Sequence, residues 1–170
     1  MSLSEISAQL SESPKRFPDC CFGISTTFIK ILCSILPQCP GFTLSVGSGS
    51  GLLEGLIAFS DKNISVQGVE VDSSINRYID EEAMHVVGGG WGLSSYAKQA
   101  KAWMFVYPRD PKLISKYIDL YGGHVELIVW LGPKVDWPDY EPCFLNSSFW
   151  VEVLDAGLTP YETAVVVRRS

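Results

Sequence analysis

Short apolar segments with the periodicity of strands alternate along most of this chain with segments of helical periodicity. Strands are predicted over residues 42–46, 64–71, 84–87, 102–107 and 125–131. Helices are predicted over residues 25–36, 52–59, 73–80, 94–101 and 111–121. Alternation of this kind favours a mainly parallel sheet with helices on both faces.

Two further predicted strands, 150–154 and 161–168, follow one another around a turn at Asp155-Ala156-Gly157. Their closeness predicts antiparallel pairing at one edge of the sheet. The whole pattern predicts an α/β fold, a single three-layer domain over residues 25–170 with a mainly parallel seven-stranded sheet. Residues 1–24 are interpreted as an N-terminal arm, loose or with one short helix. Residues 132–142 are predicted to form a loop, and 143–149 a turn of helix.

The composition excludes several classes of protein. Hydrophobic residues make up 46% of the 170 residues and charged residues 19%, which is too apolar for a disordered chain. Acidic residues number 19 against 13 basic ones, and a formal charge of −6 argues against a nucleic-acid partner. No run of about 18 apolar residues is present to span a membrane. Residues 1–18 are too polar for a signal peptide, so we expect a cytoplasmic protein.

The five cysteines form no C-x-x-C motif, and the histidines are His85 and His124 alone. An odd number of cysteines without a signal peptide predicts free thiols in a reducing compartment. Because neither histidine has a ligand-spaced partner, we expect no metal site. Each histidine is either a surface or core residue or a general base near neutral pH.

The run Leu44-Ser45-Val46-Gly47-Ser48-Gly49-Ser50-Gly51 leaves a predicted strand and opens a predicted helix. Glycines let the backbone turn tightly and let a ligand approach, and a helix N-terminus offers free N–H groups. An acid about 20 residues further on, at the end of the next strand, would hold ribose hydroxyls. Glu70 stands 19 residues after Gly51 (70 − 51), and Asp72 is either a second candidate or a helix cap.

The spacing G-x-G-x-G differs from the nicotinamide and flavin fingerprint G-x-G-x-x-G, whose last glycine would fall at Leu52. With the order of elements over residues 25–168, the motif resembles small class I, Rossmann-like methyltransferases that use S-adenosylmethionine (SAM). The resemblance implies that the glycine run lines the methionine part, that Glu70 holds the ribose and that Gly88-Gly89-Gly90-Trp91 flanks the adenine. The implied SAM-binding residues are Gly47, Ser48, Gly49, Gly51, Glu70, Val71, Gly89, Trp91 and Tyr107.

The chain departs from that family in three places. Ser45 stands where the family usually has an acid, two residues before the first glycine. Glycines stand after the third strand, where an acid is frequent. Tyr107-Pro108-Arg109-Asp110 replaces the Asn/Asp-Pro-Pro-Tyr/Phe motif of enzymes that methylate amide and adenine nitrogens. Fewer carboxylates around a cationic sulfonium predict weaker SAM binding or a changed role.

Tyr107, Arg109 and Asp110 are the candidate catalytic residues, because they lie at the end of the fourth predicted strand, which by the resemblance would face the transferred methyl group and the substrate. Tyr107 could contact substrate or cofactor, or be a core aromatic. Arg109 could clamp a carboxylate or phosphate, or lie in solvent. Asp110 could be a general base or, more simply, the N-cap of the helix that begins at Pro111.

Two further features could contribute to a substrate site. Trp137, in the loop after the fifth strand, would either cover a substrate or pin its own loop. If the N-terminal arm orders over the pocket, Phe17, Cys20 and Phe22 would be close to the ligand.

The resemblance implies a SAM-dependent methyltransferase that acts on a small molecule, with catalysis resting mainly on proximity and orientation. The alternative is a non-methylating protein on the same fold, either a partner or regulatory subunit or a repurposed enzyme with weak or no SAM binding. A homodimer could complete the site, since the chain is short and lacks the insertions that usually form a lid. A nicotinamide oxidoreductase is disfavoured by the glycine spacing.

Overall fold

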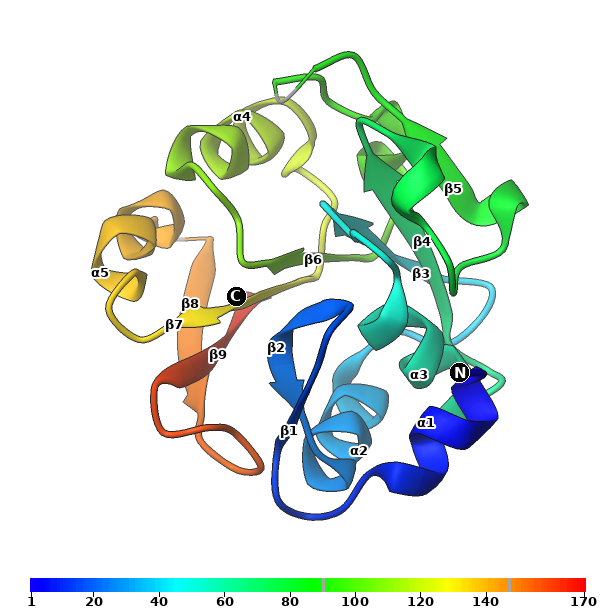
Figure 1. Cartoon of the computed structure of the whole chain (residues 1–170). Coiled ribbons are helices and arrows are strands. Elements are labelled where there is room, and N and C mark those ends of the chain that lie inside the picture. The colour runs from blue at the N-terminus through cyan, green and yellow to red at the C-terminus, as the bar shows by residue number, and fades with distance from the viewer. Residues whose placement is uncertain (90, 147) are drawn as a thin grey trace.

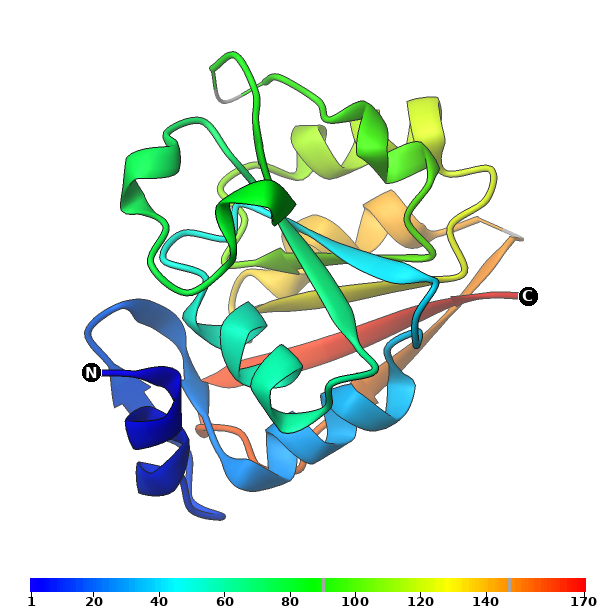
Figure 2. The same cartoon turned by 90° about the vertical axis from the view of Figure 1, so that its right-hand side faces the viewer.

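The computed structural model describes residues 1–89, 91–146 and 148–170 (Figures 1 and 2). The strands are β1 (Lys15–Phe17), β2 (Cys20–Ile24), β3 (Phe42–Val46), β4 (Ser65–Glu70), β5 (Met84–Val86), β6 (Ala102–Val106), β7 (Leu127–Pro133), β8 (Phe149–Leu154) and β9 (Glu162–Arg169). The α-helices are α1 (Leu3–Gln9), α2 (Thr26–Ile35), α3 (Leu52–Ser60), α4 (Pro111–Tyr121) and α5 (Trp137–Tyr140). Short 3-10 helices are η1 (Ser73–Ile75), η2 (Glu81–Ala83), η3 (Ser95–Lys98) and η4 (Glu141–Phe144).

The main sheet of the described chain has seven strands in the order β5-β4-β3-β6-β7-β9-β8. The five neighbouring strands β5, β4, β3, β6 and β7 run parallel, whereas β9 pairs antiparallel with both β7 and β8. The predicted seven-stranded sheet, with its antiparallel C-terminal pair at one edge, is confirmed.

Helices cover both faces of this sheet, because side chains on each strand point alternately to opposite sides. On β6, Ala102 and Met104 pack in the core formed with α2 and α3, whereas Trp103 and Phe105 pack in the core formed with α4. Figure 2 shows the sheet between these two layers, with the blue and teal helices on one side and the green and yellow ones on the other. The three-layer α/β prediction is therefore confirmed.

The helix predicted over residues 73–80 is wrong beyond its first turn. Asp72 caps η1 by accepting a hydrogen bond from the backbone N of Ser74 at 2.9 Å. Asn76 then bonds both backbone polar groups of Ile79, at 3.1 Å and 2.6 Å. Short polar side chains compete in this way with helical hydrogen bonds, and the chain leaves the helix after Ile75.

The predicted helix over residues 94–101 is also shortened, to η3. The indole N–H of Trp103 donates to the carbonyl of Ala97 at 2.9 Å, so this carbonyl accepts from a side chain instead of from a later helical N–H. The predicted loop over 132–142 is wrong in its second half, which contains α5 and the start of η4. Both helices carry a proline in their first turn, where its missing N–H is no loss. The turn predicted over 143–149 lies earlier, at η4, and Ser147 is outside the described residues.

Residues 1–24 form α1 and a β1–β2 hairpin, which was not predicted. Ser2 caps α1 by accepting from the backbone N of Glu5 at 3.2 Å. Ile6, Phe17 and Phe22 are buried in the same core as α2 and α3, so this segment packs against the sheet domain rather than lying loose.

Candidate cofactor site and adjoining cavity

The strand order reverses direction between β3 and β6. From β3 the chain proceeds outward to β4 and β5, then crosses back to β6 on the other side of β3. In open α/β sheets a ligand binds at such a switch point, outside the carboxyl ends of the strands. The loops that begin at Gly47, Val71 and Tyr107 all leave this edge of the sheet, because β3, β4 and β6 are parallel.

The glycine loop after β3 has the backbone shape that its sequence predicts. Gly47, Gly49 and Gly51 have φ angles of 77°, 59° and 78°, a region that side chains rarely allow. A Cβ at Gly47 or Gly49 would meet no atom within 4 Å, whereas one at Gly51 would lie 2.6 Å from Ile79. Gly51 is therefore required for packing, and the first two glycines leave open space above the backbone.

Glu70, the last residue of β4, reaches this loop. Its Oε2 accepts a hydrogen bond from the backbone N of Gly49 at 2.9 Å. Asp72 instead caps η1, and its hydrogen bonds to Ser74 lower the pKa of its carboxyl. Of the two acids that the sequence left open, Glu70 is thus the one beside the glycine loop.

The loop after β5 presents a more open surface. Gly89 has a φ of 70° with free space around it, and Gly90 lies outside the described residues. The side chain of Trp91 is half exposed, with the Lys116 ammonium 4.8 Å from its ring centre. Val71 and Val86 are also exposed, and Val86 pairs with Glu70 across the sheet. Exposed apolar side chains beside an acid could flank a planar base. Val86 was not among the residues predicted for the site, because the sequence shows only that it lies in a strand.

Tyr107 follows β6 in a left-handed conformation, with φ 47°. Its hydroxyl donates a short hydrogen bond to Glu162 and accepts one from the Arg16 guanidinium at 3.3 Å. Burial and the Glu162 carboxylate raise the pKa of Tyr107, which keeps its phenol protonated. Phe22 packs edge-on to the ring at 6.4 Å. Tyr107 is therefore turned toward the N-terminal hairpin.

Glu162 organises this contact between the two ends of the chain. It is buried, and its Oε1 accepts from the backbone N of Gly23 at 2.9 Å and from the Thr159 hydroxyl at 2.8 Å. Its Oε2 lies 3.6 Å from Arg16. Sequence reasoning missed Glu162 because it lies within a predicted strand, far along the chain from Gly23.

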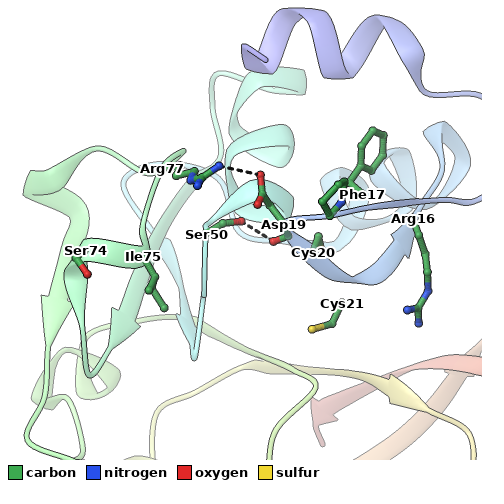
Figure 3. Close-up of a pocket in the computed structure, with 10 residues that line it drawn as sticks. Arg16, Phe17, Asp19, Cys20, Cys21, Ser50, Ser74, Ile75 and Arg77 are labelled. Atoms are coloured by element: carbon green, nitrogen blue, oxygen red, sulfur yellow. Dashed lines mark hydrogen bonds and ion pairs between the residues drawn. The ribbon is translucent and has the colours of Figure 1, made fainter.

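A cavity of about 820 Å³ lies between the hairpin and the glycine loop (Figure 3). Its lining includes Phe17, Cys20, Cys21, Ser50, Ile75 and Arg77. Asp19, at the tip of the hairpin, joins its two walls. The Asp19 carbonyl accepts from the Ser50 hydroxyl at 2.7 Å, and its carboxylate lies 3.4 Å from Arg77.

The hairpin residues flagged from the sequence take different positions. Phe17 and Cys20 line the cavity, Phe17 being buried in the core as well, whereas Phe22 lies in the core alone. Burial raises the pKa of the Cys20 thiol to about 12, so Cys20 is not a thiolate nucleophile.

Comparison with known proteins finds solved structures with a similar fold but no protein with a similar sequence. No protein-family model and no curated protein matches the chain. Precorrin-6y C5,15-methyltransferase from Geobacter metallireducens is 11% identical with a TM-score of 0.61, over 84% of this chain and 86% of that one. The methyltransferase domain of bacterial CtHen1 is 11% identical with a TM-score of 0.60, over 83% and 95%. Streptococcus pneumoniae Sp1610, a candidate tRNA (m1A22) methyltransferase in complex with S-adenosyl-L-methionine, is 15% identical with a TM-score of 0.55, over 84% and 72%.

The chain has the class I methyltransferase fold. Identities this low establish the fold alone. The resemblance drawn from the glycine spacing and the element order is confirmed at that level.

One residue near the glycine loop was missed altogether. Glu54, in the first turn of α3, is 2% exposed and accepts a hydrogen bond from the Ser45 hydroxyl at 2.5 Å. Burial raises the pKa of Glu54 to about 7. A signal was present, since Glu54 is the one charged residue within an apolar helical segment. A carboxyl thus lies beside Ser45, the position at which the sequence resemblance implied an acid.

The remaining candidates of the sequence analysis lie outside the glycine loop. Arg109 is exposed. Trp137 stacks on Phe144 and packs 5.2 Å from Trp130, which pins its own segment. Among residues 1–89, 91–146 and 148–170, no cluster of His, Cys, Asp or Glu is placed to hold a metal ion. No helix of that part of the chain is long and apolar enough to cross a membrane.

Asp110 is the N-cap of α4, since its Oδ1 accepts from the backbone N of Lys112 at 2.9 Å. Replacing Asp110 by alanine is expected to lower the free energy of unfolding by about 1 kcal/mol, because a first-turn N–H loses its partner. Asp110→Asn keeps an oxygen acceptor and should change stability by only about 0.3 kcal/mol. Urea denaturation of both variants measures this, and an unchanged midpoint for Asp110→Ala would contradict the capping role.

Proposed function

We propose that this protein is a SAM-dependent methyltransferase that acts on a small molecule. The observation that carries the proposal is the glycine loop at the switch point. The left-handed glycines Gly47 and Gly49 leave open space above their backbone, and the carboxylate of Glu70, from the next strand, accepts a hydrogen bond from the backbone N–H of Gly49. Backbone that no Cβ blocks, beside a carboxylate, fits a ligand that carries both an amino-acid part and ribose hydroxyls.

In this proposal the chain's own residues divide the cofactor among them. Gly47, Ser48, Gly49 and Gly51 would line the methionine part, Glu70 would exchange the Gly49 N–H for ribose hydroxyls, and Val71, Gly89 and Trp91 would flank the adenine. When bound, SAM supplies an electrophilic methyl group on a sulfonium. Tyr107, at the end of β6, would border the methyl group with its phenol protonated and its hydroxyl hydrogen donated to Glu162. The protein's contribution to the rate is then mainly orientation of the two reactants.

The small-molecule assignment is supported by charge, since a formal charge of −6 repels a phosphate backbone. The cavity of about 820 Å³ has a volume within the usual range for small-ligand sites and borders the glycine loop at Ser50, but none of the proposed SAM-binding residues lines it. The solved structures with this fold include enzymes named for precorrin and for RNA, so the fold itself favours neither substrate class. An RNA substrate is therefore an outcome that the experiments must address.

The second candidate, a non-methylating protein on this fold, is favoured by one observation. Tyr107 is bonded to Glu162 and Asp110 caps a helix, so two of the three candidate catalytic residues already have structural partners. Such a protein would bind SAM weakly or not at all, or bind it without turnover.

Isothermal titration of SAM, its demethylated product S-adenosylhomocysteine and NAD into the purified chain tests the proposal. We expect micromolar binding of the first two and none of NAD. Gly49→Arg should abolish this binding while the fold is kept, because the side chain fills the open space above the loop. Gly123→Arg controls for the added bulk and charge, since Gly123 is exposed and has equally open surroundings far from the loop, and thermal unfolding of both variants checks that the left-handed backbone at Gly49 tolerates the side chain. Glu70→Ala should weaken both adenosyl ligands.

Unchanged binding in Gly49→Arg would refute the site, and absence of binding to the unaltered chain would refute SAM as cofactor. Binding without methyl transfer to any small molecule or RNA would favour the non-methylating alternative.

A further inference from the structure

We propose that Glu54 is a positioning residue that makes the site prefer the cationic methyl donor over its neutral demethylated product. The inference rests on the proposed function, because the sulfonium of SAM is the cation that Glu54 would favour. It goes beyond that function because it assigns to Glu54, on α3, the negative charge that an acid at the position of Ser45 would have supplied.

The placement of Glu54 is the first observation. Its helix begins directly after the glycine loop, and the side chain points back to β3, where Ser45 donates to it at 2.5 Å. It is 2% exposed among apolar neighbours such as Leu52, Leu53 and Leu56. A buried carboxyl costs free energy unless it is paired, and an apolar side chain would pack at this position without that cost.

The charges around Glu54 are the second observation. Three elements packed near it present Ser45 from β3, Glu70 from β4 and Cys20 from β2. Glu70 repels Glu54 and raises its pKa further, while Cys20 stays protonated. Among the ion pairs of the described residues, none engages Glu54 or Glu70. Glu70 accepts a hydrogen bond from the glycine loop and Glu54 lies in the helix that begins directly after it, and no described cation is paired with either carboxyl, so a cationic ligand would supply one.

A helix cap is the simpler role for a glutamate in a first turn. There the partial positive charge of the helix N-terminus stabilises a carboxylate whatever the ligand. The two roles differ in what they predict. A cap stabilises the loop equally for SAM and for its product, whereas a charge partner of the sulfonium discriminates between them, and does so only when ionised.

The experiment compares the affinities for SAM and for S-adenosylhomocysteine by titration calorimetry at pH 6 and pH 8. In the unaltered chain the ratio of the two affinities should be larger at pH 8, because Glu54 titrates near pH 7 and the sulfonium favours its ionised form. Glu54→Gln should lower the affinity for SAM about tenfold, the order expected for one weakly screened charge pair, and that for the product by less than about threefold. The pH dependence of the ratio should disappear with it.

A charge swap separates this role from loop packing. The double variant S45D/E54S moves the carboxyl to the neighbouring strand, and we expect it to recover the preference for SAM that Glu54→Ser loses. Glu12→Gln removes the same charge from an exposed part of the N-terminal segment. It should leave the ratio of the affinities for SAM and S-adenosylhomocysteine unchanged at both pH values. If the unaltered chain binds both ligands and Glu54→Gln keeps the same ratio, the inference is wrong and the proposed function stands. If the unaltered chain binds neither ligand, both are wrong.

Discussion

Replacing Glu162 by alanine is expected to destabilise the folded chain by about 1–3 kcal/mol, because buried and half-buried hydrogen-bond donors lose their acceptor. The side chain of Glu162 is 0% exposed and accepts from Gly23, Thr159 and Tyr107, while Arg16 completes the charge pair. Without it, the buried N–H of Gly23 has no acceptor. The left-handed backbone of Tyr107 would also lose the bond that fixes its side chain.

Urea denaturation of Glu162→Ala measures this loss, and Glu152→Ala on the neighbouring strand is the matched control. The Glu152 side chain is 46% exposed and lies 4.0 Å from Arg168, so its removal should change stability by less than about 1 kcal/mol. Hydrogen exchange should show faster exchange over residues 15–24 in Glu162→Ala, because the hairpin loses its anchor. Equal stability of the two variants would show that the packing of Phe17 and Phe22 and the contacts of Asp19 hold the hairpin without Glu162.

The parts of the fold that the sequence predicts are those determined by local pattern. The strand at 125–131 could be recognised because it is apolar on both faces, which only a covered sheet centre requires. The glycine loop and Glu70 could be recognised because a glycine-rich turn after one strand and an acid at the end of the next strand occur about 20 residues apart in such folds. The structure places Glu70 at the loop, as that spacing predicts.

The parts that escaped prediction depend on partners far along the chain. The β1–β2 hairpin has strands of three and five residues, too short for a clear period, and Glu162 bonds it from 139 residues away. Glu54 lies within a helix that could be predicted, but its burial follows from the packing of α3 against the sheet. Residues 73–80 carry helical spacing, yet Asn76 and Asp72 direct their hydrogen bonds to local turns.

The second large effect is expected at Glu54, and it depends on pH. In the folded chain without ligand the pKa of Glu54 is raised from 4.5 to about 7, so the folded state binds this proton more tightly than the unfolded state. Stability therefore falls as the pH rises from about 4.5 through 7, and the loss, about 3 kcal/mol, is complete above pH 7. Glu54→Gln has no such loss.

We therefore expect Glu54→Gln to match the unaltered chain near pH 4, where Glu54 is largely protonated in both the folded and the unfolded state and similar in shape, and to be more stable by about 3 kcal/mol at pH 8. For a chain of this length that corresponds to a melting temperature about 6–12 °C higher at pH 8. Thermal unfolding at both pH values, without ligand, measures the difference, and the subtraction cancels every other titrating group. A difference that does not change with pH would show that Glu54 is ionised in the folded chain throughout this range.

This result bears on why a carboxyl occupies the position. If Glu54→Gln is more stable at pH 8, the native residue weakens the fold under conditions where a neutral side chain would serve packing better. Stabilising substitutions that weaken function are common at ligand sites, because groups placed for a ligand are poorly satisfied without it. A gain in stability from Glu54→Gln together with a loss of the preference for SAM would therefore identify Glu54 as a residue held for its charge. A gain in stability with that preference unchanged would make it a buried cap that the fold tolerates.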